Sequence, residues 1–149
     1  MGQPFSLQPL LEIMQNRTDE ATRKLGQLIA AEQSAKSRLQ MLEQYRNEYA
    51  EKLRAATSQG ITQLSLRNYQ EFMARIDEAI MQQSIAVKNS EHCTATGKSH
   101  WKEQNKRLKA IDTLSQRHDA RERYREGKQE QKLLDEFTSR RYAIKDEEG

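Results

Sequence analysis

The chain has 149 residues, of which 35% are hydrophobic and 32% are charged, and its formal net charge is +3. This composition excludes a thick globular core, because there are too few apolar side chains to fill one. No apolar run approaches the roughly 20 residues needed to span a bilayer, and the N-terminus lacks a secretory signal pattern, so we expect a soluble chain that is not exported.

A first helix is predicted over about residues 7–57. Apolar side chains recur there at alternating spacings of four and three, which is the pattern of a coiled-coil seam. The two prolines lie within the first nine residues and leave the rest of the segment free to be helical. The seam has fifteen positions, of which all but Thr18, Glu32 and Arg46 are apolar: Leu7, Leu11, Met14, Thr18, Ala21, Leu25, Leu28, Glu32, Ala35, Leu39, Leu42, Arg46, Tyr49, Leu53 and Ala56.

A turn is predicted over about residues 58–65, within the stretch TSQGITQLS. Gly60 can adopt the left-handed conformation that ends a helix. Thr62 or Ser65 can cap the helix that follows. Because the connection is short, the two helices are expected to be antiparallel neighbours.

A second helix is predicted over about residues 66–140. Its seam is apolar at nine of fourteen positions and weakest from Ser90 to Gly97: Leu66, Tyr69, Met73, Ile76, Ile80, Gln83, Val87, Ser90, Thr94, Gly97, Trp101, Gln104, Leu108 and Ile111. Beyond about residue 115 this helix is expected to outrun its partner. The stretch RHDARERYREGKQEQK is charged on every face, and local pairs worth about 0.2 to 0.5 kcal/mol each would hold it only weakly.

Together these elements predict an all-α fold, a single antiparallel coiled-coil hairpin over residues 1–149 with frayed termini. If the helices pair from the turn, the numbers of facing residues should add up to about 122. This places Leu25 opposite Gly97 and Ala21 opposite Trp101. It also places the polar residues Thr18 and Gln104 in one layer, which can set the register at some cost in stability.

Catalytic and metal-binding signals are absent. The stretch TATGKS resembles the end of a phosphate-binding loop, but His92 stands where the first glycine should be and no strand precedes it. His92, His100 and His118 have no carboxylate or cysteine spacing that would build a metal site. The lone cysteine, Cys93, excludes an internal disulfide and fits a reducing compartment. We expect no enzyme activity, metal or cofactor.

One flank of the hairpin near the turn is aromatic. In heptad terms Arg38, Tyr45, Phe72 and Ala79 occupy g positions, which lie on one side of an antiparallel pair. The other side is polar and carries Lys36, Glu43, Gln70, Asp77 and Ser84. We therefore expect a partly exposed apolar strip that binds a protein, made of Leu42, Tyr45, Tyr49, Phe72, Ile76 and Ala79. The alternative is that the strip widens the core or serves self-association.

Charge is unevenly distributed along the chain. From Lys98 to Arg141 there are 13 Lys and Arg against 8 Asp and Glu, whereas the remainder has 12 against 14. Acidic residues are interleaved throughout the basic part, which favours a solvated face or an acidic protein surface over nucleic acid. A coiled coil that binds nucleic acid, or a scaffold that dimerises through the strip, is the alternative function.

Five blocks of the chain closely resemble, in order and spacing, the flagellar FliJ family of bacterial type III export. They are MLEQYRNEYAEKL, the turn GI, NYQEFMARIDEAI, SHWKEQNKRLKAIDTLSQR and EQKLLDEFTSRR, and the likeness as a whole covers Leu39 to Arg141. The resemblance implies a cytoplasmic, non-enzymatic hairpin similar to the rotor stalk of F-type ATP synthases. Such a protein acts at the flagellar base, on the cytoplasmic face of the inner membrane, which it reaches only through the export gate.

The resemblance also implies partners: the export ATPase ring (FliI), the export-gate membrane protein (FlhA) and export chaperones (FlgN and FliT), with no small-molecule substrate. The aromatic strip with its two bordering residues would bind the gate, and basic residues near the C-terminus would contact the ATPase. The gate-binding set is Arg38, Leu42, Tyr45, Tyr49, Phe72, Ile76, Ala79 and Gln83. The ATPase-binding set is Arg117, Arg121, Arg123, Arg125, Lys128 and Lys132.

Overall fold

The computed structural model describes residues 3–148, which form two α-helices and no strand. Helix α1 spans Gln8–Gln59 and helix α2 spans Gln63–Glu148, and the predicted all-α class is confirmed. Contacts divide the described residues into two units: unit 2 comprises Glu20–Lys102, and unit 1 comprises the residues before and after it. Helix α2 is longer at both ends than the pattern predicted, because nothing within it interrupts the helix and Gly127 keeps a negative φ.

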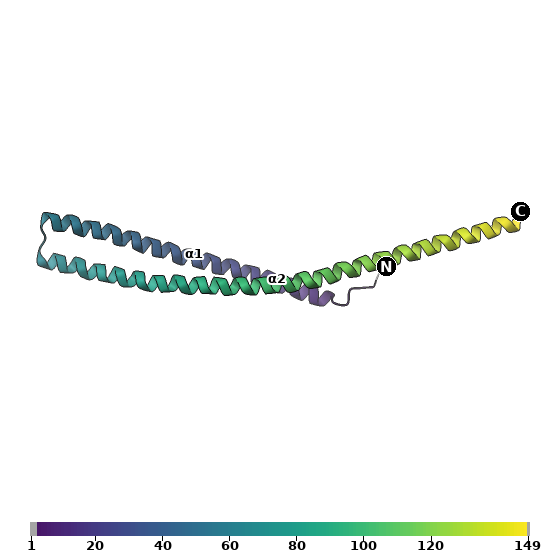
Figure 1. Cartoon of the computed structure of the whole chain (residues 1–149), viewed down its shortest axis with the longest axis horizontal. Helices are drawn as coiled ribbons and strands as arrows, with labels where there is room; N and C mark the ends of the chain where they lie inside the picture. The colour runs from purple at the N-terminus through teal and green to yellow at the C-terminus, as the bar shows by residue number, and fades with distance from the viewer. Residues whose placement is uncertain (1–2, 149) are drawn as a thin grey trace. The chain divides into compact units, whose positions relative to one another are not determined.

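Unit 2 is an antiparallel pair of helices joined by a short turn (Figure 1). Every predicted seam position from Ala21 to Ala56, and from Leu66 to Trp101, is at least partly covered. The most buried of those on α2 are Ile76 and Val87, with 6% and 7% of their surface exposed. The two seams are therefore confirmed as the faces through which the helices of unit 2 pack.

The turn follows the predicted chemistry. Gly60 has a φ of 87°, and its amide donates to the carbonyl oxygen of Thr57 at 3.2 Å, which closes α1 in the left-handed conformation. Thr62 caps α2, because its Oγ1 accepts a hydrogen bond from the amide of Ser65 at 3.2 Å. Of the two capping residues considered, the structure thus selects Thr62.

Glycine-to-alanine substitutions should have opposite effects at Gly60 and Gly26. A Cβ would meet no atom within 4 Å at either position, but only Gly60 has a positive φ. We expect Gly60→Ala to lower the free energy of unfolding by about 1 kcal/mol through backbone strain. Gly26→Ala, inside α1, should raise it by about 1 kcal/mol through helix propensity. Urea denaturation followed by circular dichroism measures both, and the same sign at both positions would contradict the assignment of the turn.

Gly97 allows the helices of unit 2 to approach closely. A Cβ at this position would lie 2.6 Å from Cδ1 of Leu28 and 3.8 Å from Cδ1 of Leu25. Three residues earlier, Thr94 Oγ1 donates to the carbonyl oxygen of Leu28 at 3.3 Å. The stretch TATGKS is therefore helix interior that packs against α1, as the pairing predicted.

Unit 1 pairs the start of α1 with α2 beyond Lys102 through a small core. Leu11 and Met14 are 6% and 8% exposed, and the polar residues Thr18 and Gln104 are both 7% exposed. Thr18 Oγ1 lies 2.8 Å from the carbonyl oxygen of Met14 and 3.4 Å from that of Gln104. The predicted polar layer is confirmed. Within the described residues, Oε1 of Gln104 is buried without a hydrogen-bond partner.

Replacing Gln104 with leucine should stabilise the chain. The bond from Thr18 reaches the backbone of Gln104, so it would survive, and the unpaired amide oxygen would disappear. Removing such a desolvated group should raise the free energy of unfolding by about 1–3 kcal/mol, and the melting temperature by roughly 2–4 °C per kcal/mol. Gln129→Leu makes the same change at an exposed helical position. Equal shifts for both variants would show that burial of Gln104 is not the cause.

The segment before α1 extends the pairing of unit 1 further than the heptads predicted. The rings of Phe5 and His118 are tilted, with centroids 5.4 Å apart. His118 Nε2 lies 2.8 Å from the carbonyl oxygen of Gln3, and the amide of Gln3 donates to Glu122 at 3.1 Å. Helix α1 begins only at Gln8, so the contacts of α2 past residue 115 come from the irregular segment before α1, which the heptads did not predict. On α2, the stretch in which every side chain is exposed begins at residue 127 and extends to residue 147.

Candidate protein-binding surfaces

An aromatic cluster bridges the two helices of unit 2 near the turn. The ring centroid of Phe72 lies 4.4 Å from that of Tyr49 and 6.2 Å from that of Tyr45. Tyr45 and Tyr49, one turn apart on α1, have centroids 6.4 Å apart. These tilted and edge-on arrangements are favourable for aromatic pairs. Three residues of the predicted strip are therefore brought together on one flank.

The members of the strip differ in exposure. Tyr45 is 48% exposed, and the bordering residue Arg38 is also exposed. Four other strip residues and the bordering Gln83 are half-buried: Leu42, Tyr49, Phe72, Ala79 and Gln83. Ile76 is only 6% exposed, so the expectation that it is partly exposed was wrong. Its heptad d position turns it into the interface between the helices. Ile76 can support the strip from beneath but offers little surface of its own.

Two contacts at the edges of the strip go beyond what the heptad pattern predicted. Tyr69, assigned only to the seam, places its ring 5.3 Å from that of Tyr49 and so extends the aromatic cluster toward the turn. The sequence could have indicated this role of Tyr69, because it is an aromatic residue at a seam position close to Phe72. Gln83 donates from Nε2 to the carbonyl oxygen of Ala35 at 3.0 Å, across the helix pair. This bond holds the border of the strip in place.

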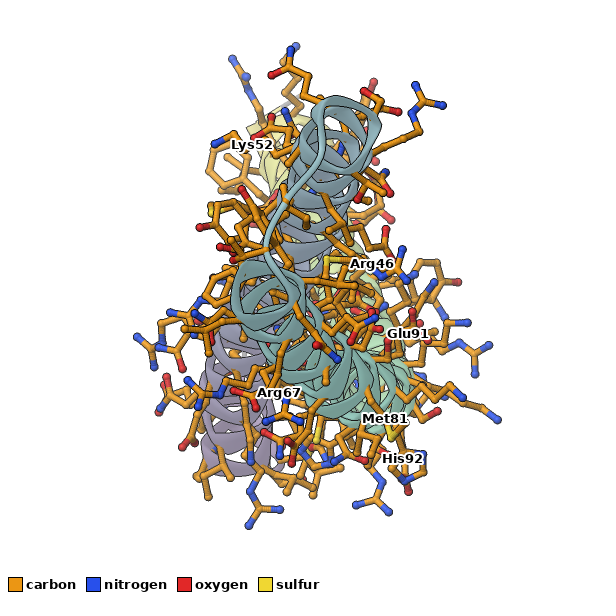
Figure 2. The ribbon with its side chains drawn as sticks, turned by 90° about the vertical axis from the view of Figure 1, so that its left-hand side faces the viewer. Arg46, Lys52, Arg67, Met81, Glu91 and His92 are labelled. Carbon is orange, nitrogen blue, oxygen red and sulfur yellow. The ribbon has the colours of Figure 1, made fainter. Side chains whose placement is uncertain are left out.

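The opposite flank of unit 2 is charged and internally paired. Arg46 forms an exposed ion pair with Asp77, and Lys36 lies 3.7 Å from Glu91. In Figure 2, which views the chain from the turn, Arg46 and Glu91 lie on the same side and Lys52 on the other. The hydrogen bond to Asp77 and then its charge raise the pKa of Arg46. The guanidinium of Arg46 would lose its charge only as pH rises through that raised pKa, so its side of the pair should not respond to pH near neutrality.

The six candidate ATPase-binding cations all lie on the part of α2 that belongs to unit 1, and all are exposed. At 100° per residue, five of them form one stripe along the helix, and Arg123 lies on the other side. Within this region Arg125 lies 3.5 Å from Glu122, and the Lys128 ammonium lies 5.1 Å from the ring centroid of Tyr124. The stripe is formed by Arg117, Arg121, Arg125, Lys128 and Lys132.

An apolar face runs along the last part of α2, away from the basic stripe. Leu133 and Phe137 are each 65% exposed, and Ile144 is 56% exposed. By helical periodicity they lie on the same side of α2 as Gln104, and around Gln104 this side packs on α1. Helix α1 starts at Gln8 and does not reach them. The unpaired end of α2 therefore carries a basic side and an apolar side.

Residues 3–148 contain no group of three or more His, Cys, Asp or Glu side chains that could hold a metal ion. In the same range, neither helix has a stretch that is apolar enough to cross a membrane. Two helices paired through heptad seams, with side-chain surfaces on their flanks, define a coiled-coil protein.

The family model described as "Flagellar FliJ protein" matches residues 3–147. The chain is also 31% identical over 140 residues to the flagellar FliJ proteins of Salmonella typhi and Escherichia coli K12, covering 94% of this chain and 95% of each relative. The chain therefore belongs to the flagellar FliJ protein family. It has a role in flagellar export and motility, and the family is not an enzyme family.

Proposed function

We propose that the chain is a stalk and adaptor of the flagellar export apparatus, which promotes assembly and activity of the export ATPase ring (FliI) and docks to the export gate (FlhA). The observation that carries the stalk role is the end of α2, where side chains over residues 127–147 are exposed along the whole helix. A single helix of this length gains little stability from local pairs. A partner that surrounds it would supply the missing contacts.

The basic stripe supports contact with the ATPase ring. Five cations share one side of the helix, so an acidic ring pore could pair with several of them at once. Such contacts can activate the ATPase only if they differ between states of the ring, because a ligand shifts an equilibrium through differential affinity. The stalk would then favour the subunit arrangement that fits its basic side.

The aromatic strip supports docking to the gate. Tyr45 is half exposed, and Phe72 and Tyr49 stand beside it in a cluster held by both helices. Rigid aromatic side chains that are already ordered bind a partner with little loss of conformational entropy. Handling of the chaperones FlgN and FliT belongs to the same proposal. The chain would work in the cytoplasm, at the inner-membrane face of the flagellar base.

Measurement of ATP hydrolysis tests the proposal. The purified chain should hydrolyse no ATP by itself, yet it should raise the turnover rate of its cognate export ATPase. The effect should saturate at micromolar concentrations of the chain. An unchanged ATPase rate over this range would contradict the stalk role. Steeply salt-dependent binding to DNA or RNA would favour the alternative function instead.

A further inference from the structure

The flank of unit 2 that carries Tyr45 and Phe72 has no carboxylate at its g and c positions from Lys24 to Tyr45 and from Phe72 to His100, and Glu20 and Glu48 bound this stretch on α1. Sixteen g and c positions of the two helices make up this acid-free flank: Lys24, Gln27, Ala31, Ser34, Arg38, Met41, Tyr45, Phe72, Arg75, Ala79, Gln82, Ala86, Asn89, Cys93, Thr96 and His100. The set contains three cations, Lys24, Arg38 and Arg75, among uncharged polar, small and apolar side chains.

The charges on this flank are available to a partner. On the opposite flank Lys36 and Arg46 are engaged with Glu91 and Asp77. In contrast, Lys24, Arg38 and Arg75 form no ion pair with any residue of the described chain. All three are exposed. The three cations of the acid-free flank are therefore not held in ion pairs within the described residues.

An apolar groove of about 560 Å³ lies at the end of this flank farthest from the turn. Its floor is formed by Ala21, Leu25 and Leu28 of α1 and by Gly97 of α2, against which Leu28 packs closely. Lys24 and His100 lie at its rim, and exposed Cys93 lies in its wall. A bulky apolar side chain from another molecule could enter between these groups.

We propose that the acid-free flank binds an acidic amphipathic helix of a partner protein. An apolar residue of that helix fills the groove beside Gly97, and its carboxylates face Lys24, Arg38 and Arg75. The methyl side chains of Ala31, Ala79 and Ala86 allow close approach of a third helix. Between Lys24 and Tyr45 there is room for about 21 residues of helix, or roughly 31 Å. This is the helix-in-groove mode of recognition.

This inference goes beyond the stalk and adaptor role. Its apolar contact, the groove, is separate from the aromatic strip, although Arg38 and Ala79 of the flank also belong to the gate-binding set. The groove is lined by Ala21, Leu25, Leu28, Cys93, Thr96 and Gly97, none of which belongs to the strip. A partner could bind the groove whether or not Tyr45 and Phe72 contact the export gate. The two surfaces can therefore be tested with different variants.

The chain's one cysteine reports on the groove. The probe is a synthetic helix of about 21 residues with leucines along one side and glutamates beside them, compared with the same peptide carrying lysines. Saturating glutamate peptide should slow alkylation of Cys93 by iodoacetamide at least about tenfold, and the lysine peptide should not. In a Cys93→Ser background, Ala95→Cys places the thiol on the opposite flank, where neither peptide should protect it.

Charge variants complete the test. Lys24→Glu and Ala86→Glu should each weaken binding of the glutamate peptide about tenfold or more. Ala95 is also an exposed alanine but lies on the opposite flank, so Ala95→Glu should leave binding unchanged. Equal binding of both peptides, no protection of Cys93, or an equal loss in all three variants would overturn the proposal. So would a dimeric chain whose Cys93 is protected without peptide, because the occupant would then be a second copy.

The ATPase assay separates this proposal from the function proposed above. Ala86→Glu does not alter the basic stripe, so stimulation of the export ATPase should remain within about twofold of the unmodified chain. Failure of the peptide to bind a chain that stimulates the ATPase would overturn the inference alone. Binding of the peptide by a chain that gives no stimulation would overturn the stalk role alone.

Discussion

Replacing Tyr45 and Phe72 together with alanine is expected to abolish binding to the export gate while helical content stays nearly unchanged. Aromatic side chains at the centre of an interface often contribute about 2 kcal/mol or more each. Loss of both would therefore weaken binding about a thousandfold. Binding of the purified cytoplasmic part of the export gate can be followed by calorimetry, and far-UV circular dichroism measured on the same samples reports the helices.

The helices should tolerate this double substitution because the seam beneath it is retained. Ile76 stays buried between the helices at 6% exposure, and Gln83 still donates to the carbonyl oxygen of Ala35. Met81→Ala is the control, since Met81 is 66% exposed and occupies a heptad b position on the other flank. Concurrent unfolding of the double variant would instead support a role in core packing. Unchanged gate binding would place the docking surface elsewhere.

Reversing the charge of the basic stripe on α2 is expected to remove stimulation of the export ATPase. The variant changes five exposed cations to glutamate: Arg117, Arg121, Arg125, Lys128 and Lys132. Each altered contact would become repulsive toward an acidic pore, so the stimulated rate should fall at least about tenfold toward the basal rate. The change should leave the paired helices intact, because none of these side chains is buried. Steady-state ATP hydrolysis at increasing stalk concentration measures the effect.

Arg123 provides the internal comparison. It is also exposed, but helical periodicity places it on the other side of α2 from the stripe. Arg123→Glu should therefore reduce stimulation much less than a single stripe substitution such as Arg121→Glu. Equal losses from Arg121→Glu and Arg123→Glu would mean that net charge alone matters. Full stimulation by the five-residue variant would exclude the stripe as the ATPase contact.

The heptad spacing by itself determined the two helices, the faces that pair and their register. This succeeded because apolar periodicity is a local property and a short turn leaves antiparallel helices one way to pair. The facing of Thr18 with Gln104, and the packing of Gly97 near Leu25, follow from counting outward from Gly60. The left-handed turn was predictable for the same local reason, since glycine adopts a positive φ without strain.

Only the tertiary structure decided how individual side chains are used. Ile76 is buried while Tyr45 is half exposed, because exposure depends on how far each side chain extends past its neighbours on the other helix. The docking of Phe5 on His118 joins an irregular segment to a helix over more than a hundred residues of sequence, and no periodicity encodes such a contact. The groove beside Gly97 is likewise lined by residues of both helices, so it has no signature within either one.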